Sequence, residues 1–158
     1  MESIQFKITL GVIEIIGDDA GIQTIRIQEE QQIKKQSIPK ALEASVEQLK
    51  EYIEGSRTTF TFLMNPKGTE FQKQVWNILL TIPFGKTLSY LEVAQIYDNT
   101  KAVRAVAAAI GKNPILDAVP CNRVIGSNGS LVGFASGLDK KKWLLENEGF
   151  PFQTEIPF

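Results

Sequence analysis

The sequence of 158 residues contains no histidine and a single cysteine, Cys121. One cysteine cannot form an internal disulfide, and without histidine the remaining strong metal ligands are carboxylates, so a structural zinc site is excluded. The same absence excludes the Cys-His pair that activates the nucleophile of cysteine hydrolases. We therefore expect chemistry that is metal-free or uses a hard cation, and we predict no cofactor.

Long hydrophobic runs are also missing. No apolar stretch approaches the roughly 20 residues that a membrane-spanning helix needs. The first residues, MESIQFKITLG, carry polar and acidic side chains where a secretion signal would need a basic start and an unbroken apolar run. Hydrophobic residues make up 43% of the chain and charged residues 22%, a composition typical of a folded globule. The sequence thus predicts a cytoplasmic protein without a membrane segment. We also expect a monomer.

The net charge of −1 conceals an asymmetry between the two halves. Residues 1–64 contain 7 Lys or Arg against 10 Asp or Glu, which gives −3, whereas residues 65–150 contain 10 against 7, which gives +3. The second segment is therefore where a polyanion would bind. Differences of this size also occur between solvated faces of unrelated proteins, so the interpretation depends on motifs.

Residues 1–64 have the patterns of a small α/β domain. Apolar residues alternate with other residues over 6–16 and again over 22–27. Turn-forming residues occupy 17–21 between them, and this arrangement predicts a β-hairpin.

A helix and a short strand complete the predicted N-terminal domain. The helix begins near Ile38-Pro39 and ends at Gly55, a plausible C-cap. The strand is expected over 58–63, where two phenylalanines share one face, and Asn65-Pro66 marks the domain boundary. The buried stripe of the helix is predicted to contain Leu42, Val46, Leu49 and Ile53.

Residues 65–150 are predicted to form a mainly α domain. Thr69 can cap a helix that ends before Pro83, and a last helix is expected over 140–148. Between them, short helices over 89–97 and 102–112 flank a tight polar turn, the outline of a helix-turn-helix. The predicted fold class is therefore an α/β N-terminal domain, a mainly α C-terminal domain containing a helix-turn-helix and an active-site loop, and a tail over 151–158.

The second helix of this pair carries almost no side-chain bulk, apart from the projecting Arg104. Small residues can simply permit tight helix packing, and alanine is favoured in any helix. A slim face with one cation beside a polar turn also suits a helix that closely approaches nucleic acid. The small residues are Ala102, Ala105, Ala107, Ala108, Ala109 and Gly111.

The single cysteine lies in the stretch VPCNRVIG. A lone cysteine is most often a small buried hydrophobe. Here, turn-forming residues surround it at 113–114, 126–129 and 133–137, so Cys121 is expected among loops that can wrap a small ligand. This context favours a functional thiol.

Five motifs follow one another along the chain: GTEFQKQVW, IPFGKTLSY, RAVAAAIGKNP, PCNRVIGSNGSLVGFASGL and KKWLLENEG. Together they resemble the O6-alkylguanine-DNA alkyltransferase family from about Gly68 to Gly149, while residues 1–64 resemble its variable N-terminal domain in layout. The resemblance implies DNA repair by direct reversal. An alkyl group would pass irreversibly from O6 of a flipped guanine in double-stranded DNA to Cys121, and each molecule would act once.

Asn122 is the main departure from the family, which has histidine after the cysteine. In the family, cysteine, that histidine acting through a water, and a glutamate matched here by Glu148 form a relay that generates the thiolate. A thiol with a pKa near 8.5 is only a few per cent thiolate at neutral pH. Asparagine can preserve hydrogen bonds in such a network but cannot take up a proton.

Three interpretations of Asn122 follow. Glu148 acting through water, or Arg123 together with helix dipoles, could supply enough thiolate for a working, slower transferase. Alternatively, the protein binds alkylguanine in DNA without transfer, as the alkyltransferase-like proteins do. The third interpretation is that asparagine was introduced to trap a complex. We favour the transferase because Cys121 is retained.

The resemblance also implies roles for other residues. Arg104 would enter the duplex through the minor groove and fill the space of the flipped nucleotide, with Ala105 and Arg123 also facing DNA. Tyr90 would help to rotate the phosphate and donate a proton to the leaving base. The residues implied at the substrate pocket are Asn113, which braces the active-site turn, together with Val124, Phe134, Ala135 and Ser136.

A helix-turn-helix regulator without chemistry is the competing hypothesis. It requires bulky polar side chains on the second helix that contact base edges in the major groove. The alanines of that helix argue against such contacts.

Overall fold

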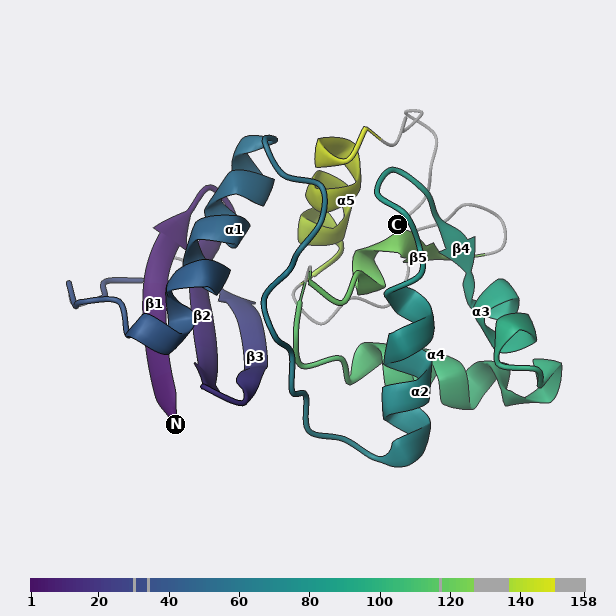
Figure 1. The fold of residues 1–158 in the computed structure, drawn as a ribbon. Helices are drawn as coiled ribbons and strands as arrows, with labels where there is room; N and C mark the ends of the chain where they lie inside the picture. Colours follow the sequence, from purple (N-terminus) through teal and green to yellow (C-terminus); the bar gives the residue numbers. More distant parts are fainter. Residues whose placement is uncertain (30, 34, 117, 127–136, 150–158) are drawn as a thin grey trace. The chain divides into compact units, whose positions relative to one another are not determined.

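The computed structural model describes residues 1–29, 31–33, 35–116, 118–126 and 137–149. The chain divides into two compact units, shown in Figure 1. One unit comprises Met1–Lys67 with Pro114–Leu116, and the other comprises Gly68–Asn113 with Asp117–Phe158. None of the helices in the described ranges has the length and apolar character needed to cross a membrane. The predicted tail over 151–158 lies outside the described residues.

The first unit contains a three-stranded antiparallel sheet in the order β1-β2-β3. Its strands are β1 (Glu2–Ile8), β2 (Gly11–Asp18) and β3 (Gly21–Gln28). The prediction of one strand over 6–16 is therefore wrong, because the chain turns between β1 and β2. The alternation of apolar and other residues continues through the turn between β1 and β2, because the apolar side chains of both strands face the same core.

Rows of isoleucines across the sheet form the core of this unit. Ile4 on β1 pairs with Ile15 on β2, which pairs with Ile25 on β3. All three side chains are at most 3% exposed. Burying a side chain of this kind stabilises the fold by about 1.5–3 kcal/mol, so these rows set the strand register.

The predicted helix of this unit lies over one face of the sheet (Figure 1). A short 3₁₀ helix, η1 (Lys40–Leu42), leads into α1 (Glu43–Glu54). The helix ends at Gly55, whose φ of 87° belongs to the left-handed region that glycine adopts without strain. The C-cap prediction is confirmed. Tyr52, which the helical stripe did not include, is fully buried.

Residues 58–63 do not form the predicted strand, because a side chain supplies the hydrogen bonds that a neighbouring strand would give. Gln48 Oε1 accepts from the Thr61 backbone N–H at 2.9 Å, and Gln48 Nε2 donates to Thr61 Oγ1 at 2.8 Å. Phe60 and Phe62 nevertheless share one side: Phe60 packs on Tyr52 at 5.3 Å and on Phe62 at 5.6 Å between ring centroids. β-Bonding resumes only at Met64, which bridges to β3.

The second unit begins with α2 (Glu70–Leu79), which starts at Thr69 as predicted. Thr69 Oγ1 accepts from the Gln72 backbone N–H at 3.1 Å, while the Gln72 side chain accepts from the Thr69 N–H at 2.9 Å. This reciprocal capping satisfies two otherwise unpaired donors. Trp76 is 2% exposed, and its indole N–H donates to the Ala109 carbonyl at 2.8 Å, which fixes α2 against α4 (Val103–Gly111).

The predicted helix-turn-helix outline is present in this unit. It consists of α3 (Tyr90–Ile96), a polar turn with the 3₁₀ helix η2 (Thr100–Ala102), and α4. Asp98 in the turn adopts a φ of 72°, a conformation that aspartate tolerates better than most side chains. The buried face of α4 consists of Val106, Ala109 and Ile110.

The remaining elements of the second unit surround the cysteine. These are β4 (Leu88–Ser89), the 3₁₀ helix η3 (Cys121–Arg123), β5 (Val124–Ile125) and α5 (Leu138–Asn147). Strands β4 and β5 are parallel, with Leu88 opposite Val124 and Ser89 opposite Ile125. The last helix was predicted over 140–148, so the structure shifts its start two residues towards the N-terminus.

Candidate active site

Cys121 is the first residue of η3, directly after Pro120. Its side chain is 6% exposed. The short parallel pair β4-β5 places the beginning of α3, with Tyr90, beside the strand that follows η3, and α5 packs against η3 itself. Segments far apart in the sequence therefore converge on the turn that carries the thiol.

A buried ion pair anchors this turn. The Arg123 Nε donates to Glu148 Oε1 at 2.7 Å, and its Nη2 donates to Glu148 Oε2 at 3.1 Å. The third arm, Nη1, donates to the Ile82 carbonyl at 2.6 Å. The side chains of Arg123 and Glu148 are 8% and 1% exposed. A bidentate ion pair that is buried from water fixes the relative position of its two side chains. Removing either partner would leave the other charge buried without a counter-charge.

Two further N–H donors of the described residues reach the Glu148 carboxylate. Asn122 Nδ2 donates to Oε2 and the Gly85 backbone N–H donates to Oε1, each at 3.3 Å. Gly85 has a φ of 79°, which a side chain would strain. An ionised carboxylate offers about four acceptor positions, and these donors together with Arg123 occupy four. In this arrangement Glu148 holds the turn in place and already has its acceptor positions engaged.

Asn122, the residue that departs from the family pattern, is fully buried. Its Nδ2 contacts Glu148, while its Oδ1 accepts no hydrogen bond from any group in the described part of the chain. A buried acceptor without a donor typically costs about 1–3 kcal/mol of stability. The amide thus preserves the link to Glu148 but brings no titrating group to Cys121.

Lys141 on α5 is a site residue that the sequence analysis missed. It is 0% exposed, and its Nζ lies 5.7 Å from the centre of the Tyr90 ring. Burial lowers the pKa of Lys141 from 10.5 to about 8, and the electrostatic effect of Cys121 partly opposes this fall. The signal was the helical spacing: Lys141 shares its buried stripe with Leu144, Leu145 and Glu148.

Tyr90 is the first residue of α3, after the capping residue Ser89. Burial, and secondly the electrostatic effect of Cys121, raise the pKa of Tyr90 from 10.0 to about 12. The hydroxyl therefore remains protonated at neutral pH and is available as a hydrogen-bond donor. The Lys141 Nζ lies over the Tyr90 ring, and Cys121 contributes to the pKa of both groups, so we treat the three side chains as one cluster.

Two of the residues predicted to form the substrate pocket lie in the described part of the chain, Asn113 and Val124. The Asn113 side chain donates to the Val119 carbonyl at 2.8 Å, two residues before Cys121, the kind of bond expected of a brace for this turn. Val124 is fully buried in β5. The remaining pocket residues proposed from the sequence, Phe134, Ala135 and Ser136, lie outside the described residues.

The predicted DNA-facing residues divide into two groups. Arg104 and Ala105 are exposed on α4, opposite its buried face. Arg123, in contrast, is 6% exposed and its guanidinium is engaged by Glu148 and Ile82. Its burial argues against a phosphate contact and assigns Arg123 to the support of the cysteine turn.

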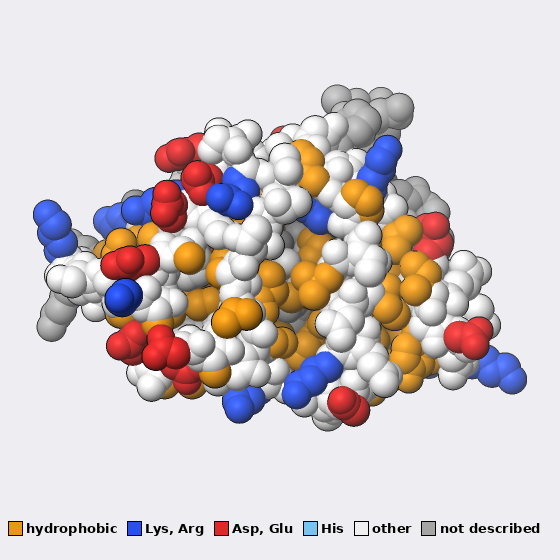
Figure 2. All heavy atoms as spheres, viewed as in Figure 1, with side chains coloured by type: hydrophobic (Ala, Val, Ile, Leu, Met, Phe, Trp, Pro, Cys, Tyr) orange, Lys and Arg blue, Asp and Glu red, His pale blue; other side chains and the backbone are white. Residues whose placement is uncertain are grey.

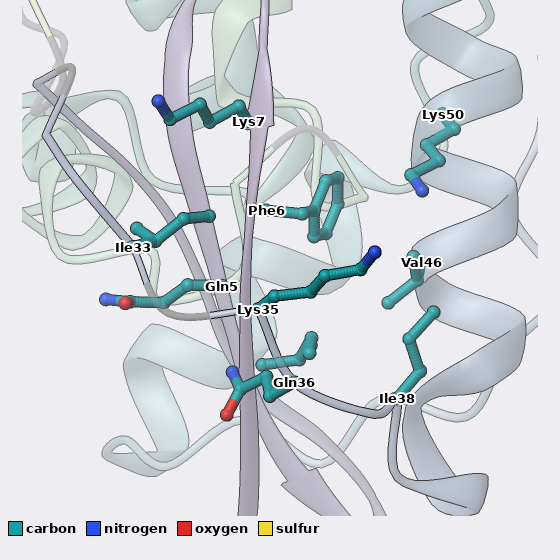
Figure 3. Close-up of a pocket in the computed structure, with 10 residues that line it drawn as sticks. Gln5, Phe6, Lys7, Ile33, Lys35, Gln36, Ile38, Val46 and Lys50 are labelled. Carbon is teal, nitrogen blue, oxygen red and sulfur yellow. The ribbon is translucent and has the colours of Figure 1, made fainter.

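The first unit presents different surface chemistry. Figure 2 shows acidic side chains gathered over α1, whose Glu43, Glu47 and Glu54 are exposed. The unit also holds a cavity of about 350 Å³ between β1, α1 and the segment before it, shown in Figure 3. Lys50 is directed towards the Phe6 ring there, at 5.3 Å from the ring centre. None of the residues that line this cavity belongs to the Cys121 cluster.

Carboxylates and the thiol do not gather into a metal site: among the described residues, no group of three or more aspartate, glutamate or cysteine side chains could hold an ion.

Two family profiles match the chain and together span most of it. The profile described as "6-O-methylguanine DNA methyltransferase, ribonuclease-like domain" matches residues 3–65. The profile described as "6-O-methylguanine DNA methyltransferase, DNA binding domain" matches residues 70–150, which include every residue of the Cys121 cluster.

Individual relatives agree with these profiles. A methylated-DNA–protein-cysteine methyltransferase of Methanosarcina acetivorans is 42% identical over 151 residues, covering 91% of this chain and 96% of the relative. The crystal structure of Mycobacterium tuberculosis OGT in complex with DNA superposes with a TM-score of 0.82 at 38% identity, covering 91% of this chain and 90% of the other. S. pombe Atl1, in complex with damaged DNA containing O6-carboxymethylguanine, covers 57% of this chain and 86% of its own, with 30% identity and a TM-score of 0.50. With matching profiles over both units and a full-length relative at this identity, the chain belongs to the 6-O-methylguanine DNA methyltransferase family.

Proposed function

We propose that this protein repairs DNA by transferring an alkyl group, in the first place methyl, from O6 of guanine to Cys121. The observation that carries the proposal is the position of the chain's only thiol. Cys121 lies in a buried turn anchored by Arg123 and Glu148, within electrostatic reach of a protonated tyrosine and a buried lysine. Family membership supports the same chemistry.

The proposed reaction is a displacement at the alkyl carbon. The Cys121 sulfur forms the new S–C bond while the C–O6 bond breaks and guanine leaves with its electron pair. Tyr90, whose hydroxyl stays protonated because its pKa is raised to about 12, would donate a hydrogen bond to the leaving base. The thioether has no route back to the thiol, so each molecule would act once.

Access to Cys121 requires that the target nucleotide leave the duplex, because the buried sulfur cannot reach a base that stays stacked and paired. Exposed Arg104 on the slim face of α4 would occupy the space of the flipped nucleotide, and Ala105 would allow close approach to the minor groove. Val124, Phe134, Ala135 and Ser136 are proposed to line the pocket for the flipped base. A monomer acting in the cytoplasm without metal or cofactor remains our prediction.

A second candidate function is recognition of alkylguanine in DNA without transfer. Asn122 favours it, because the amide cannot take up the Cys121 proton and Glu148 already accepts four hydrogen bonds. In that case the cluster would bind the lesion but leave the sulfur as an unreactive thiol.

Mass spectrometry distinguishes the two functions. The protein is incubated with a duplex containing O6-methylguanine, with an unmodified duplex as control, and then analysed intact and as peptides. Transfer predicts one added methyl group on the peptide that contains Cys121, and none in the Cys121→Ser variant. Lesion binding without any methylated peptide would overturn the transferase proposal in favour of recognition alone.

A further inference from the structure

The groups around Cys121 differ in their ability to hold its proton. Asn122 has no titrating group, and the Arg123 guanidinium offers only hydrogen-bond donors and is paired with Glu148. At least four N–H donors of the described residues already engage the Glu148 carboxylate. Among the described residues, a proton acceptor for the thiol must therefore come from another element.

The element that packs against the cysteine turn is α5, and its buried face carries Lys141. This side chain is 0% exposed, whereas its neighbours Lys140 and Lys142 are half-buried. Its Nζ lies over the Tyr90 ring at 5.7 Å, and Lys141 and Cys121 interact electrostatically. Fully burying an ammonium group is unfavourable unless its surroundings compensate, and an aromatic face and a nearby anionic sulfur both do so.

We propose that Lys141 takes the place of the imidazole that this chain lacks: it accepts the Cys121 proton, and its ammonium form then holds the sulfur as a thiolate. This inference rests on the proposed transferase function, whose site it describes in more detail. It also explains how a family member with Asn122 can retain a reactive cysteine.

The proposed alkyl transfer conserves protons and electrons. In the molecules whose Lys141 is the neutral amine, the S–H proton moves to its nitrogen, and the sulfur electron pair forms the bond to the alkyl carbon. The C–O6 bond breaks with its electrons passing to guanine, which then takes up one proton, supplied by the Lys141 ammonium. Overall, one proton moves from sulfur to guanine and no further reactant is needed.

The energetics suit such an exchange. Burial brings the pKa of Lys141 to about 8, so at neutral pH a fraction of the molecules carries the neutral amine that can accept a proton. Among the described residues, the ionisable groups around this pair are Tyr90 from α3, Arg123 from η3 and Glu148 after α5. Tyr90 is neutral at physiological pH, and the charges of Arg123 and Glu148 compensate one another.

The direct test is the ultraviolet absorbance of the thiolate as a function of pH. Cys121 is the only cysteine in the sequence, so the Cys121→Ser variant provides the blank. We compare Lys141→Met, which removes the charge but keeps an unbranched side chain of nearly the same length, with Lys141→Arg. Lys142→Met, at the next residue, is the matched control. Circular dichroism establishes that each variant is folded, and this assay needs neither DNA nor access to the buried sulfur.

We expect Lys141→Met to move the thiolate titration to higher pH and to slow methyl transfer near neutral pH by about tenfold or more, because an adjacent cation typically shifts such a titration by at least one unit. Lys141→Arg should keep the titration at low pH, since it keeps the charge, yet transfer slowly because it cannot accept a proton. Lys142→Met should change neither quantity.

Adding an imidazole sharpens the test. In an Asn122→His background a second proton acceptor is present, so Lys141→Met should slow transfer several-fold less than in the natural sequence, a non-additive result. An unchanged thiolate titration in Lys141→Met, or equal losses of transfer in both backgrounds, would overturn the inference. If the titration depends on Lys141 but no variant transfers methyl, the proposed function fails while the role of Lys141 stands.

Discussion

The two units of the chain bury different kinds of side chain. Among the described residues, the first unit buries two polar side chains, Ser45 and Gln48, and no charged one. The second buries Arg123, Lys141 and Glu148, all around the cysteine turn. Burial of an apolar side chain stabilises a fold by itself, whereas a buried charge is tolerated only beside a counter-charge or hydrogen-bond partners. The first core is therefore organised for stability, and the second sacrifices stability to place charges near Cys121.

The largest expected effect comes from breaking the buried ion pair. Glu148→Gln leaves the Arg123 guanidinium without its counter-charge and should lower the free energy of unfolding by about 3–5 kcal/mol in urea denaturation. The matched control is Glu51→Gln in the first unit, where Glu51 pairs with Arg57 at 3.0 Å but the two side chains are 36% and 27% exposed. That substitution should cost less than about 1 kcal/mol. Similar losses in both variants would contradict the contrast between the units.

A cavity in the apolar core should affect stability alone. Leu49 is fully buried on α1, so Leu49→Ala should cost about 2–5 kcal/mol of unfolding free energy. Unlike Glu148→Gln, it should leave the thiolate titration of Cys121 in the folded protein unchanged. Ile53→Ala, at a half-buried position of the same helix, serves as the milder control. A shifted titration in Leu49→Ala would show that the chemistry of the thiol depends on the first core as well.

Removing the buried lysine should stabilise the protein. The pKa of Lys141 is lowered from 10.5 to about 8 in the folded chain. Between these values the unfolded chain still binds a proton that the folded chain has released, so stability rises with pH in this window and the full cost of burial applies below about pH 8. At about 1.4 kcal/mol per pH unit over this window, Lys141→Met should gain about 3 kcal/mol near neutral pH.

Urea denaturation at several pH values checks this prediction. The natural sequence should gain stability between about pH 8 and 10, and Lys141→Met should lose this slope. Tyr90 acts in the opposite direction at higher pH, because its raised pKa makes the folded chain retain a proton between 10.0 and about 12 that the unfolded chain releases. A flat profile in the natural sequence below pH 10 would show that burial of Lys141 carries no such cost.

The same contrast separates what sequence patterns predict from what they miss. Local signals were reliable: Gly55 ends α1 and Thr69 begins α2, because caps involve residues within one turn of each other. Residues 58–63 have strand composition, but a glutamine side chain takes the place of the neighbouring strand.

The charged cluster was harder to predict because its parts are distant along the chain. Arg123 and Glu148 are 25 residues apart, and their side-chain types are usually exposed, so no local pattern indicates that they pair. The DNA contact expected of Arg123 came from the family resemblance. Lys141 sits in a run of three lysines that is typical of a solvated helix face. Only its spacing to the buried leucines of α5 distinguishes it from its neighbours.

The smallest expected effect compares two equivalent caps, only one of which borders the site. Thr69 and Ser89 each form a capping box, so Thr69→Ala and Ser89→Ala should each cost about 1 kcal/mol of unfolding free energy. Ser89 also lies in β4, directly before Tyr90, and its loss would loosen the start of the helix that carries the hydroxyl. We therefore expect Ser89→Ala, measured under conditions where both variants are fully folded, to slow methyl transfer by up to about tenfold, since a small misplacement of a donor is costly. Thr69→Ala should transfer at the normal rate. Ser89→Thr keeps the capping oxygen and should therefore recover most of the loss. Equal transfer rates in the two alanine variants would show that the cap of α3 contributes to stability but not to the placement of Tyr90.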